Sequence, residues 1–96
     1  MTHRFYFQPA QSMVYLDDQS IDLVVTSPPY PMIEMWDSIL GQQNAEITAA
    51  LAEKQPRKAF ELMHQVLDPV WSECFRVLKE GSFLCINIGD ATRTID

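Results

Sequence analysis

The feature that most constrains this sequence is an apolar, β-branched run that ends abruptly at two consecutive prolines. Ile21–Val25 has the length and composition of a short buried strand. Pro28 and Pro29 have no backbone N–H for a sheet ladder, so the strand must end before them. The residue before each proline is also pushed away from helical geometry, which keeps Ser27 extended. The sequence therefore predicts a stiff polar loop at the carboxyl end of a strand, which is where open α/β sheets bind ligands.

The chemistry of the Ser27–Tyr30 loop suits a planar ligand that carries an amino group. The two prolines offer carbonyl oxygens and no N–H groups, Ser27 adds a hydroxyl, and Tyr30 adds a flat ring. Fixed acceptors beside a stacking ring fit a nucleobase that is flipped out of a duplex. The alternative interpretation is a Pro-Pro turn whose tyrosine packs into the core, because proline often marks turns. The preceding apolar strand favours the first interpretation.

A long helix is predicted to connect this strand to a second one. Lys58–Leu78 contains an apolar stripe at three- and four-residue spacing. The stripe consists of Ala59, Met63, Val66, Val70, Cys74 and Val77, and it is widened by Phe60, Leu67, Trp71, Phe75 and Leu78. Pro69 interrupts the pattern, so either Asp68 caps a second helix or one helix kinks there. Lys79–Gly81 is the expected helix stop, whose glycine can take a positive φ, and Ser82–Ile88 predicts a second buried strand.

A strand, a helical crossover and another strand make a right-handed parallel unit, whose strands end at the same edge of the sheet. This arrangement is expected to place Asn87, Gly89 and Asp90 near the Ser27–Tyr30 loop. At that position Asp90 can touch a cofactor or substrate, or it can cap the next turn.

Four further segments complete the expected structure. Arg4–Phe7 is a candidate aromatic strand, and Ala10–Asp17 is a candidate short helix. Asn44 is a suitable N-cap for a helix over Ala45–Lys54, which is rich in Ala, Leu and Glu. Pro31–Gly41 is either a flexible apolar rim over a target base or a packing segment, and we favour the packing segment.

Two stretches of the sequence resemble the amino-directed DNA methyltransferases. Thr26–Tyr30, placed directly after the apolar strand, is similar to the catalytic motif of that family. Phe75–Gly81 followed by Ser82–Asp90 is similar to its helix, Leu-Lys-x-Gly turn and next strand. The matched segments cover roughly half of the chain in the family's order. The resemblance implies an α/β fold, namely a partial Rossmann-like S-adenosylmethionine-dependent methyltransferase fold with a mostly parallel sheet and flanking helices, in which residues 1–96 form a single partial catalytic domain.

The resemblance also implies a reaction, in which a methyl group passes from S-adenosylmethionine to the exocyclic amino group of a flipped cytosine or adenine. The catalytic residues that it implies are Ser27, Pro28, Pro29 and Tyr30. Ser27 and the Pro28 carbonyl would accept hydrogen bonds from the amino group, and Tyr30 would stack on the base. Ser27, Pro28 and Asp90 are also expected beside the cofactor. Family members with serine at the first motif position are more often cytosine enzymes, so cytosine N4 is expected over adenine N6.

The sequence departs from the family pattern in two places. Gln8-Pro9 stands where a Gly-Asp pair often follows the first strand. The three glycines, Gly41, Gly81 and Gly89, do not form the Gly-x-Gly turn of a cofactor-binding unit. In one branch of the family the catalytic motif precedes the cofactor motif, and this sequence fits the front portion of that order. We therefore expect a fragment or split subunit that lacks the Gly-rich motif and the DNA-recognition region, and that self-associates or needs a complementing C-terminal half.

The charge of the chain argues against nucleic-acid binding by this segment alone. Seven Lys and Arg stand against 13 Asp and Glu, which gives a net charge of -6, whereas phosphate contacts need a basic face. DNA is therefore expected as a partner through the full-length protein. Two alternatives stay open, namely an amino-methyltransferase that acts on RNA or protein, and a non-catalytic acidic α/β interaction module.

The remaining composition predicts a cytoplasmic, prokaryotic and nucleoid-associated protein without a membrane anchor or a metal site. The sequence has neither a signal peptide nor a membrane-spanning apolar run. Cys74 and Cys85 lie in apolar surroundings and are predicted to be reduced core residues. Neither His3 nor His64 has a second histidine at ligand spacing, so we expect no metal ion.

Overall fold

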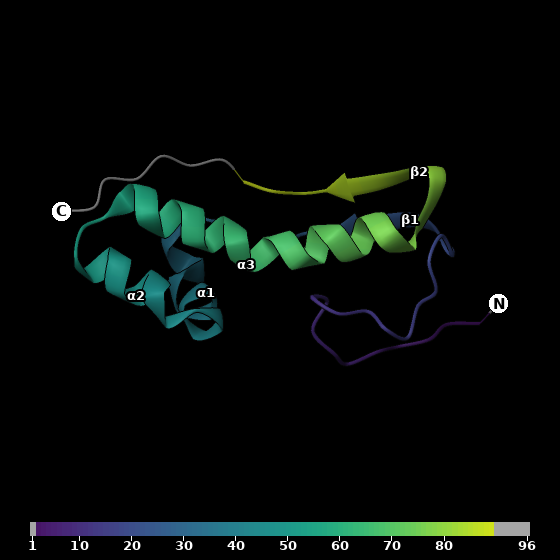
Figure 1. Cartoon of the computed structure of the whole chain (residues 1–96), viewed down its shortest axis with the longest axis horizontal. Helices are drawn as coiled ribbons and strands as arrows, with labels where there is room; N and C mark the ends of the chain where they lie inside the picture. The colour runs from purple at the N-terminus through teal and green to yellow at the C-terminus, as the bar shows by residue number, and fades with distance from the viewer. Residues whose placement is uncertain (1, 90–96) are drawn as a thin grey trace.

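The computed structural model describes residues 2–89 as an α/β fold in which one long helix lies beside a two-stranded parallel sheet (Figure 1). Its elements are, in chain order, β1 (Ile21–Thr26), the 3-10 helix η1 (Glu34–Trp36), α1 (Asp37–Gln43), α2 (Ala45–Ala52), α3 (Pro56–Val77) and β2 (Leu78–Ile86). The two short helices gather at one end of α3, and the sheet lies toward the other end. The described residues thus contain the predicted strand–helix–strand unit with parallel strands.

The sheet pairing is regular at the carboxyl ends of the strands and irregular at their amino ends. Leu23 lies opposite Phe83 and Thr26 lies opposite Ile86, while the register shifts ahead of Leu23. Gly81 lies in this irregular stretch with a φ of 79°, as predicted. A left-handed residue within a bulge favours glycine, which pays no steric penalty there.

One continuous helix, α3, spans the region where two alternatives had been open. Pro69 lies inside it, and the helix neither ends nor restarts at Asp68. Pro69 is exposed, so water can replace the backbone hydrogen bond that proline cannot make. Pro56 occupies the first turn, where its missing N–H costs nothing. The helix ends at Val77, one residue before the predicted Leu78. Strand β2 begins directly at Leu78, so Lys79–Gly81 is part of the strand, and the predicted strand start at Ser82 is wrong by four residues.

The end of α3 is tied to the start of β1 by backbone hydrogen bonds. The N–H of Gln19 donates to the Arg76 carbonyl at 2.9 Å, and the N–H of Ser20 donates to the Val77 carbonyl at 2.8 Å. A helix leaves its last carbonyls without internal partners, so these two N–H groups supply the donors that the carbonyls of Arg76 and Val77 need. They also fix where β1 begins relative to the end of α3.

The densest core lies at the helical end of the molecule. It is formed by Leu40, Ile47, Ala50, Ala59, Leu62 and Met63. Four members of the predicted stripe on α3 are buried, together with Leu67 and the unpredicted Leu62. Phe60 and Phe75 were expected to widen the stripe, but they are 49% and 86% exposed. The stripe is therefore buried under the short helices and again at Cys74 and Val77 near the sheet, while Phe60 and Phe75 at its edges are exposed.

Local signals correctly gave the beginning of α2 and nearly its end. The Asn44 side chain accepts a hydrogen bond from the Glu46 N–H at 3.0 Å, which is the predicted N-cap. The helix ends at Ala52, and Lys54 follows with a φ of 57°. The Gln55 N–H reaches back to the Ala50 carbonyl at 2.9 Å, a pattern typical of helix ends that close through a left-handed residue.

The prediction that both strands are buried is wrong for one face of the sheet. Leu23, Val25 and Phe83 are 54%, 72% and 72% exposed, and Cys85 is also exposed. Leu23 pairs with Phe83 and Val25 pairs with Cys85, so the four side chains share one surface, which we call the open sheet face. Nothing in residues 2–89 covers this face, and burial of a strand requires a covering layer.

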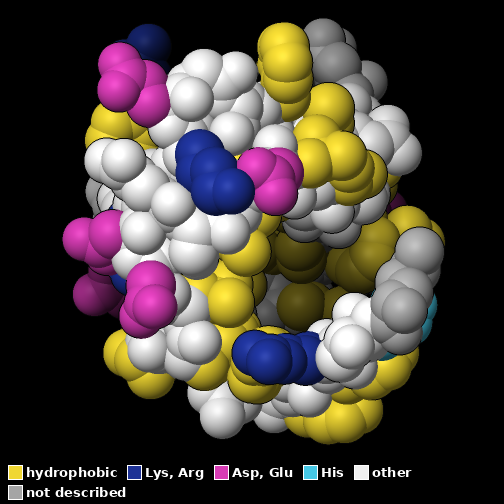
Figure 2. Space-filling model, turned by 90° about the vertical axis from the view of Figure 1, so that its right-hand side faces the viewer, with side chains coloured by type: hydrophobic (Ala, Val, Ile, Leu, Met, Phe, Trp, Pro, Cys, Tyr) yellow, Lys and Arg dark blue, Asp and Glu magenta, His cyan; other side chains and the backbone are white. Residues whose placement is uncertain are grey.

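The opposite side of the sheet is only loosely covered by α3. Leu84 of β2 and Trp71 and Phe75 of α3 line a cavity of about 900 Å³ between the two elements. Figure 2 looks at the end of the molecule where α3 passes into β2, and it shows hydrophobic side chains around a hollow in this end. The helical end therefore carries the packing that the sheet end lacks.

The segment before β1 differs from its prediction. Neither the Arg4–Phe7 strand nor the Ala10–Asp17 helix forms. Within the described residues, neither outer edge of the two-stranded sheet pairs with a third strand. Tyr6 instead stacks on Tyr15, with a ring-centroid distance of 4.1 Å. A lone aromatic strand without a pairing edge gains little.

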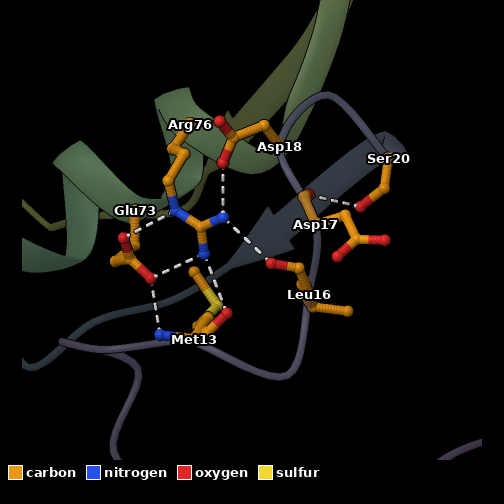
Figure 3. Close-up of polar contacts among 7 residues, drawn as sticks. All are labelled: Met13, Leu16, Asp17, Asp18, Ser20, Glu73 and Arg76. Atoms are coloured by element: carbon orange, nitrogen blue, oxygen red, sulfur yellow. Dashed lines mark hydrogen bonds and ion pairs between the residues drawn. The ribbon is translucent and has the colours of Figure 1, made fainter.

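Arg76, near the end of α3, holds this segment in place (Figure 3). Its guanidinium donates to the Leu16 carbonyl at 2.9 Å, the Asp18 carboxylate at 2.8 Å and the Met13 carbonyl at 2.8 Å. Glu73 accepts from the Arg76 Nε at 2.9 Å and from the Met13 N–H at 2.5 Å. The Met13 carbonyl is a group that the predicted helix would have paired internally. Its use by Arg76 competes with helix formation, and the segment instead contains a turn in which the Leu16 N–H donates to the Met13 carbonyl at 3.0 Å.

The same contacts shift the ionisation of Glu73. The hydrogen bond from Arg76 and then the backbone N–H of Met13 lower the pKa of Glu73 from 4.5 to about 2. The Glu73 side chain is only 19% exposed, so the charged pair is partly shielded from water. The carboxylates of Glu73 and Asp18 in turn raise the pKa of Arg76, which stays charged at every pH of interest.

We expect acid to weaken the contacts that Glu73 makes between α3 and the Met13–Asp18 segment. A carboxyl group whose pKa is lowered by folding stabilises the native state fully above its unfolded pKa of 4.5, and this contribution disappears as the pH falls toward about 2. The free energy of unfolding of the Glu73→Gln variant should therefore depend less on pH across this window. Urea unfolding at several pH values measures this, with exposed Glu61→Gln on the same helix as the control. Equal acid dependence in both variants would contradict the expectation.

The structure also bears on the membrane and cysteine predictions. No helix among residues 2–89 has the length and hydropathy needed to cross a membrane. Cys74 is buried, as predicted, and both cysteines are free thiols. The prediction that Cys85 lies in the core is wrong, because this side chain belongs to the open sheet face.

Candidate functional site

The Ser27–Tyr30 loop leaves the sheet at the shared carboxyl edge of the two strands. The Asn87 N–H donates to the Thr26 carbonyl at 2.9 Å, so the chain after β2 runs beside the start of the loop. Gly89 follows and lies against Tyr30, which confirms that these residues meet the loop. Asp90, the other residue expected there, lies outside the described residues.

Within the loop, the serine and tyrosine side chains converge. The hydroxyls of Ser27 and Tyr30 are 3.1 Å apart and share a hydrogen bond in which either can be the donor. Pro28 is buried and anchors the backbone, while Ser27 is exposed and Tyr30 is half-buried. The tyrosine is thus neither a core residue, as the alternative interpretation required, nor a free surface ring.

A tight turn directly after the loop connects it to the helical core. The Ile33 N–H donates to the Tyr30 carbonyl at 3.3 Å, with Pro31 and Met32 at the two central positions. Met32 has a φ of 67°, so the turn has the pattern of type II, which usually takes glycine there. The Met32 N–H points at the sulfur of buried Met63, 3.2 Å away. Pro31 at the first central position is the sequence signal for this turn, which was not predicted.

The segment after the turn is mainly a packing segment, as we favoured. Met32 and Trp36 pack against the helical core, and Leu40 is 1% exposed. Trp36 also approaches Tyr30, with ring centroids 6.2 Å apart and ring planes tilted by 56°. The indole N–H of Trp36 is buried without a hydrogen-bond partner among the described residues. One ring of this segment therefore belongs both to the core and to the surroundings of the loop.

The loop offers hydrogen-bond acceptors and an aromatic ring. Among residues 2–89, no group of three or more acidic, histidine or cysteine side chains is placed to hold a metal ion. Cys74 is buried within α3, and burial raises the pKa of its thiol, which disfavours the reactive thiolate. The chemistry that the loop itself supports is hydrogen bonding to an amino group beside a stacking surface.

S-adenosylmethionine fits this part of the chain only in part. The Ser27–Tyr30 loop can face the group that is to be methylated, through a hydroxyl and the proline carbonyls. The chain lacks a Gly-x-Gly turn, and the cavity of about 900 Å³ lies between α3 and β2 on the side of Asp18 and Gln19. Those residues precede β1, so this cavity lies at the amino end of the strands. The cavity and the Ser27–Tyr30 loop thus lie at opposite ends of the strands.

Comparison with known proteins places the chain in a family. The family model described as DNA methylase, of the N6/N4 type, matches residues 21–95. The type II methyltransferase M.MjaI of Methanocaldococcus jannaschii is 46% identical over 105 aligned positions, which cover 98% of this chain and 35% of that protein. The type II methyltransferase M.MthZI of Methanothermobacter thermautotrophicus is 47% identical over 95 positions, covering 98% of this chain and 27% of that protein. No solved structure gives a significant match.

This chain belongs to the N6/N4 DNA methylase family. The family resemblance stated from the Thr26–Tyr30 motif is thereby confirmed. Membership implies a Rossmann-like methyltransferase fold and S-adenosylmethionine as the methyl donor. The chain spans about a third of the length of the relatives it matches, 35% of one and 27% of the other.

Proposed function

We propose that residues 1–96 form part of the catalytic domain of a site-specific type II DNA methyltransferase, active in restriction–modification. The observation that carries this proposal is the Ser27–Tyr30 loop at the shared carboxyl edge of two parallel strands, with the Ser27 and Tyr30 hydroxyls 3.1 Å apart. Ligands of open α/β sheets bind at this edge. The similarity to two type II methyltransferases supports DNA as the substrate.

In the proposed mechanism, Ser27 and the Pro28 carbonyl accept hydrogen bonds from the exocyclic amino group of the flipped base. These bonds favour a pyramidal nitrogen and stabilise the positive charge that grows on it in the transition state. S-adenosylmethionine, when bound, would supply an electrophilic methyl group and leave as S-adenosylhomocysteine, and the methylated nitrogen would release one proton to solvent. The Ser27 O–H can donate a hydrogen bond to the Tyr30 hydroxyl oxygen, 3.1 Å away, which leaves the lone pairs of Ser27 for the amino group. Because the loop is stiff and set in advance, little reorganisation is needed during the reaction.

Tyr30 is proposed to stack on the base, which contributes about 1–3 kcal/mol of binding in comparable cases. Pro29 keeps the loop extended ahead of it, and Pro28 is already buried. Asp90 is proposed to contact the cofactor, with Ser27 and Pro28 beside it. We propose cytosine N4 as the methylated atom because the motif begins with serine.

The experiment that tests this proposal uses the full-length protein and methyl-labelled S-adenosylmethionine. We expect label in duplex DNA, and N4-methylcytosine as the modified nucleoside after complete digestion. N6-methyladenine would retain the amino-methyltransferase and overturn the choice of base. Label in RNA or in glutamine residues, with none in DNA, would show the alternative of another amino-methyltransferase. Absence of label from every acceptor would favour the acidic interaction module, which the net charge of -6 already suits.

We further propose that the open sheet face binds another polypeptide, either a complementing part of the methyltransferase or a second copy. The relatives are about three times as long as the matched region, so they contain further chain that can cover the face. An apolar, unpaired sheet also invites self-association. DNA contacts are assigned to that further chain, since residues 1–96 are acidic.

The 96-residue chain alone is therefore expected to form dimers or larger species. Phe83 is at the centre of this expectation because it is 72% exposed within the open sheet face. Phe83→Lys should shift sedimentation velocity profiles toward the monomer by placing a charge in the apolar contact. Phe7→Lys is the matched control, since Phe7 is 95% exposed and lies outside the sheet. A monomeric wild-type chain, or equal effects of the two substitutions, would contradict the expectation.

A further inference from the structure

Gly89 lies so close to Tyr30 that any side chain would collide with its ring. A β-carbon at Gly89 would fall 2.9 Å from the Tyr30 Cδ2 and 3.0 Å from its Cε2, and 3.3 Å from the Cδ1 of Ile33. Carbon atoms in contact normally keep about 3.5–4.0 Å between them. Tyr30 and Ile33 are the two ends of the tight turn after the loop, so both ends of that turn rest on this glycine.

Glycine is needed at position 89 because there is no room for a side chain, whereas Gly81 in β2 is needed for its backbone conformation. Gly81 has a φ of 79° and nothing within 4 Å of where its β-carbon would be, so its requirement is conformational. At Gly89 the neighbouring ring itself fills the position of the side chain. A substitution at Gly89 therefore acts on Tyr30, whereas a substitution at Gly81 acts on the local backbone.

Tyr30 has little freedom to move away from an added side chain. Its hydroxyl shares a hydrogen bond with Ser27, and its ring lies beside that of Trp36, with ring centroids 6.2 Å apart. Its backbone is held between Pro29 and Pro31, whose φ angles are fixed. Displacement of the ring would thus break the hydrogen bond to Ser27 or push against Trp36, which packs on the core.

We propose that Gly89 is a positioning residue for methyl transfer, which sets the place of the Tyr30 ring and, through the shared hydrogen bond, the orientation of the Ser27 hydroxyl. This inference rests on the proposed function of the loop. It assigns to the end of β2 a role that neither the motif nor the family match gives it. The Cδ2 and Cε2 atoms of the ring rest against the backbone at Gly89, which limits where the ring can lie.

The test compares Gly89→Ala with the unchanged protein, both at full length, by labelled methyl transfer to DNA. We expect kcat/KM for DNA to fall by about tenfold to a hundredfold, since a displacement of about 1 Å in a positioned group can cost as much. The same change is then made together with Tyr30→Ala. Without the ring there is nothing for the added methyl to strike, so Gly89→Ala should have little further effect in that background.

Thermal unfolding supplies a readout that is independent of activity. It compares the unchanged protein, Gly89→Ala, Tyr30→Ala and the double variant. Gly89→Ala should lower the Tm when Tyr30 is present and leave it nearly unchanged when Tyr30 is alanine. Gly81→Ala is the matched control, because its backbone penalty should be the same in both backgrounds. Coupling in the Tm alone stays informative even where Gly89→Ala folds poorly.

Two results separate the possible failures. Equal losses from Gly89→Ala with and without Tyr30 would overturn the positioning role while the methyltransferase activity stands. An unmodified full-length protein that transfers no methyl group to DNA would overturn the proposed function, and the Tm comparison would then still show whether Gly89 holds the ring.

Discussion

Replacement of Ser27 by alanine is expected to lower kcat for methyl transfer by the full-length protein by about 10²–10³-fold, the usual loss when one preorganised hydrogen-bonding group is removed from a transition state. Ser27 is exposed at the shared edge of the strands and bonded to Tyr30 at 3.1 Å. Its hydrogen bond to the amino group should matter most when the nitrogen becomes positively charged. KM for DNA should therefore change much less than kcat, because the ground state needs this bond less.

Ser72→Ala is the control for this experiment. Ser72 is exposed on α3, outside the loop. The Ser72→Ala substitution therefore removes the same hydroxyl group without touching the candidate site. Single-turnover rates at saturating DNA separate the chemical step from product release. Activity of the Ser27→Ala protein within about twofold of the unchanged protein would remove the serine from the mechanism. If Tyr30→Ala also left activity unchanged, the interaction-module interpretation would replace the enzyme interpretation for this segment.

The largest effect on stability is expected from Ile47→Ala, which should lower the free energy of unfolding by about 2–5 kcal/mol. Ile47 is 0% exposed at the centre of the helical core. Truncation there removes buried methyl groups and leaves a cavity between α2 and its neighbours. Met32 packs against the same core and carries the turn that follows the loop, so the loss should also loosen the Ser27–Tyr30 loop.

Urea unfolding of the full-length protein followed by circular dichroism measures this difference. Ile39→Ala is the matched control, since Ile39 lies on the adjacent helix α1 and is 42% exposed. Its truncation should cost clearly less, because much of the side chain is already in water. Comparable losses at the two positions would mean that the helical core does not carry the stability of this region.

The position of the candidate site was predictable because it depends on short-range signals. Two prolines ended β1, and an apolar run after Gly81 predicted β2. The parallel connection then required that both strands end at one edge, and the Asn87–Thr26 hydrogen bond shows that they do. The sequence predicted that Gly89 lies near Tyr30. It did not predict how closely the two pack, because spacing along the sequence does not say where a side-chain ring lies.

The segment before β1 and the burial of the strands were not predictable in the same way. Arg76 lies about sixty residues after the backbone groups that it binds, and no local pattern announces that pairing. Burial likewise depends on the layer that covers a strand. The apolar residues of β1 and β2 predicted two covered faces, while residues 2–89 supply only a partial cover on one side. The pattern of polar and apolar residues along a strand therefore indicates which face can be buried, but it does not identify the element that covers this face.

The open sheet face carries its own chemical probe. Cys85 is an exposed free thiol on this face, whereas Cys74 is 3% exposed and burial raises its pKa. A water-soluble alkylating reagent should therefore modify this chain at one site, because exposure and thiolate formation both control the rate. In a longer protein, protection of that same thiol would report directly that another layer had closed over the sheet. The rate at which one cysteine is alkylated thus becomes a measure of how complete the domain is.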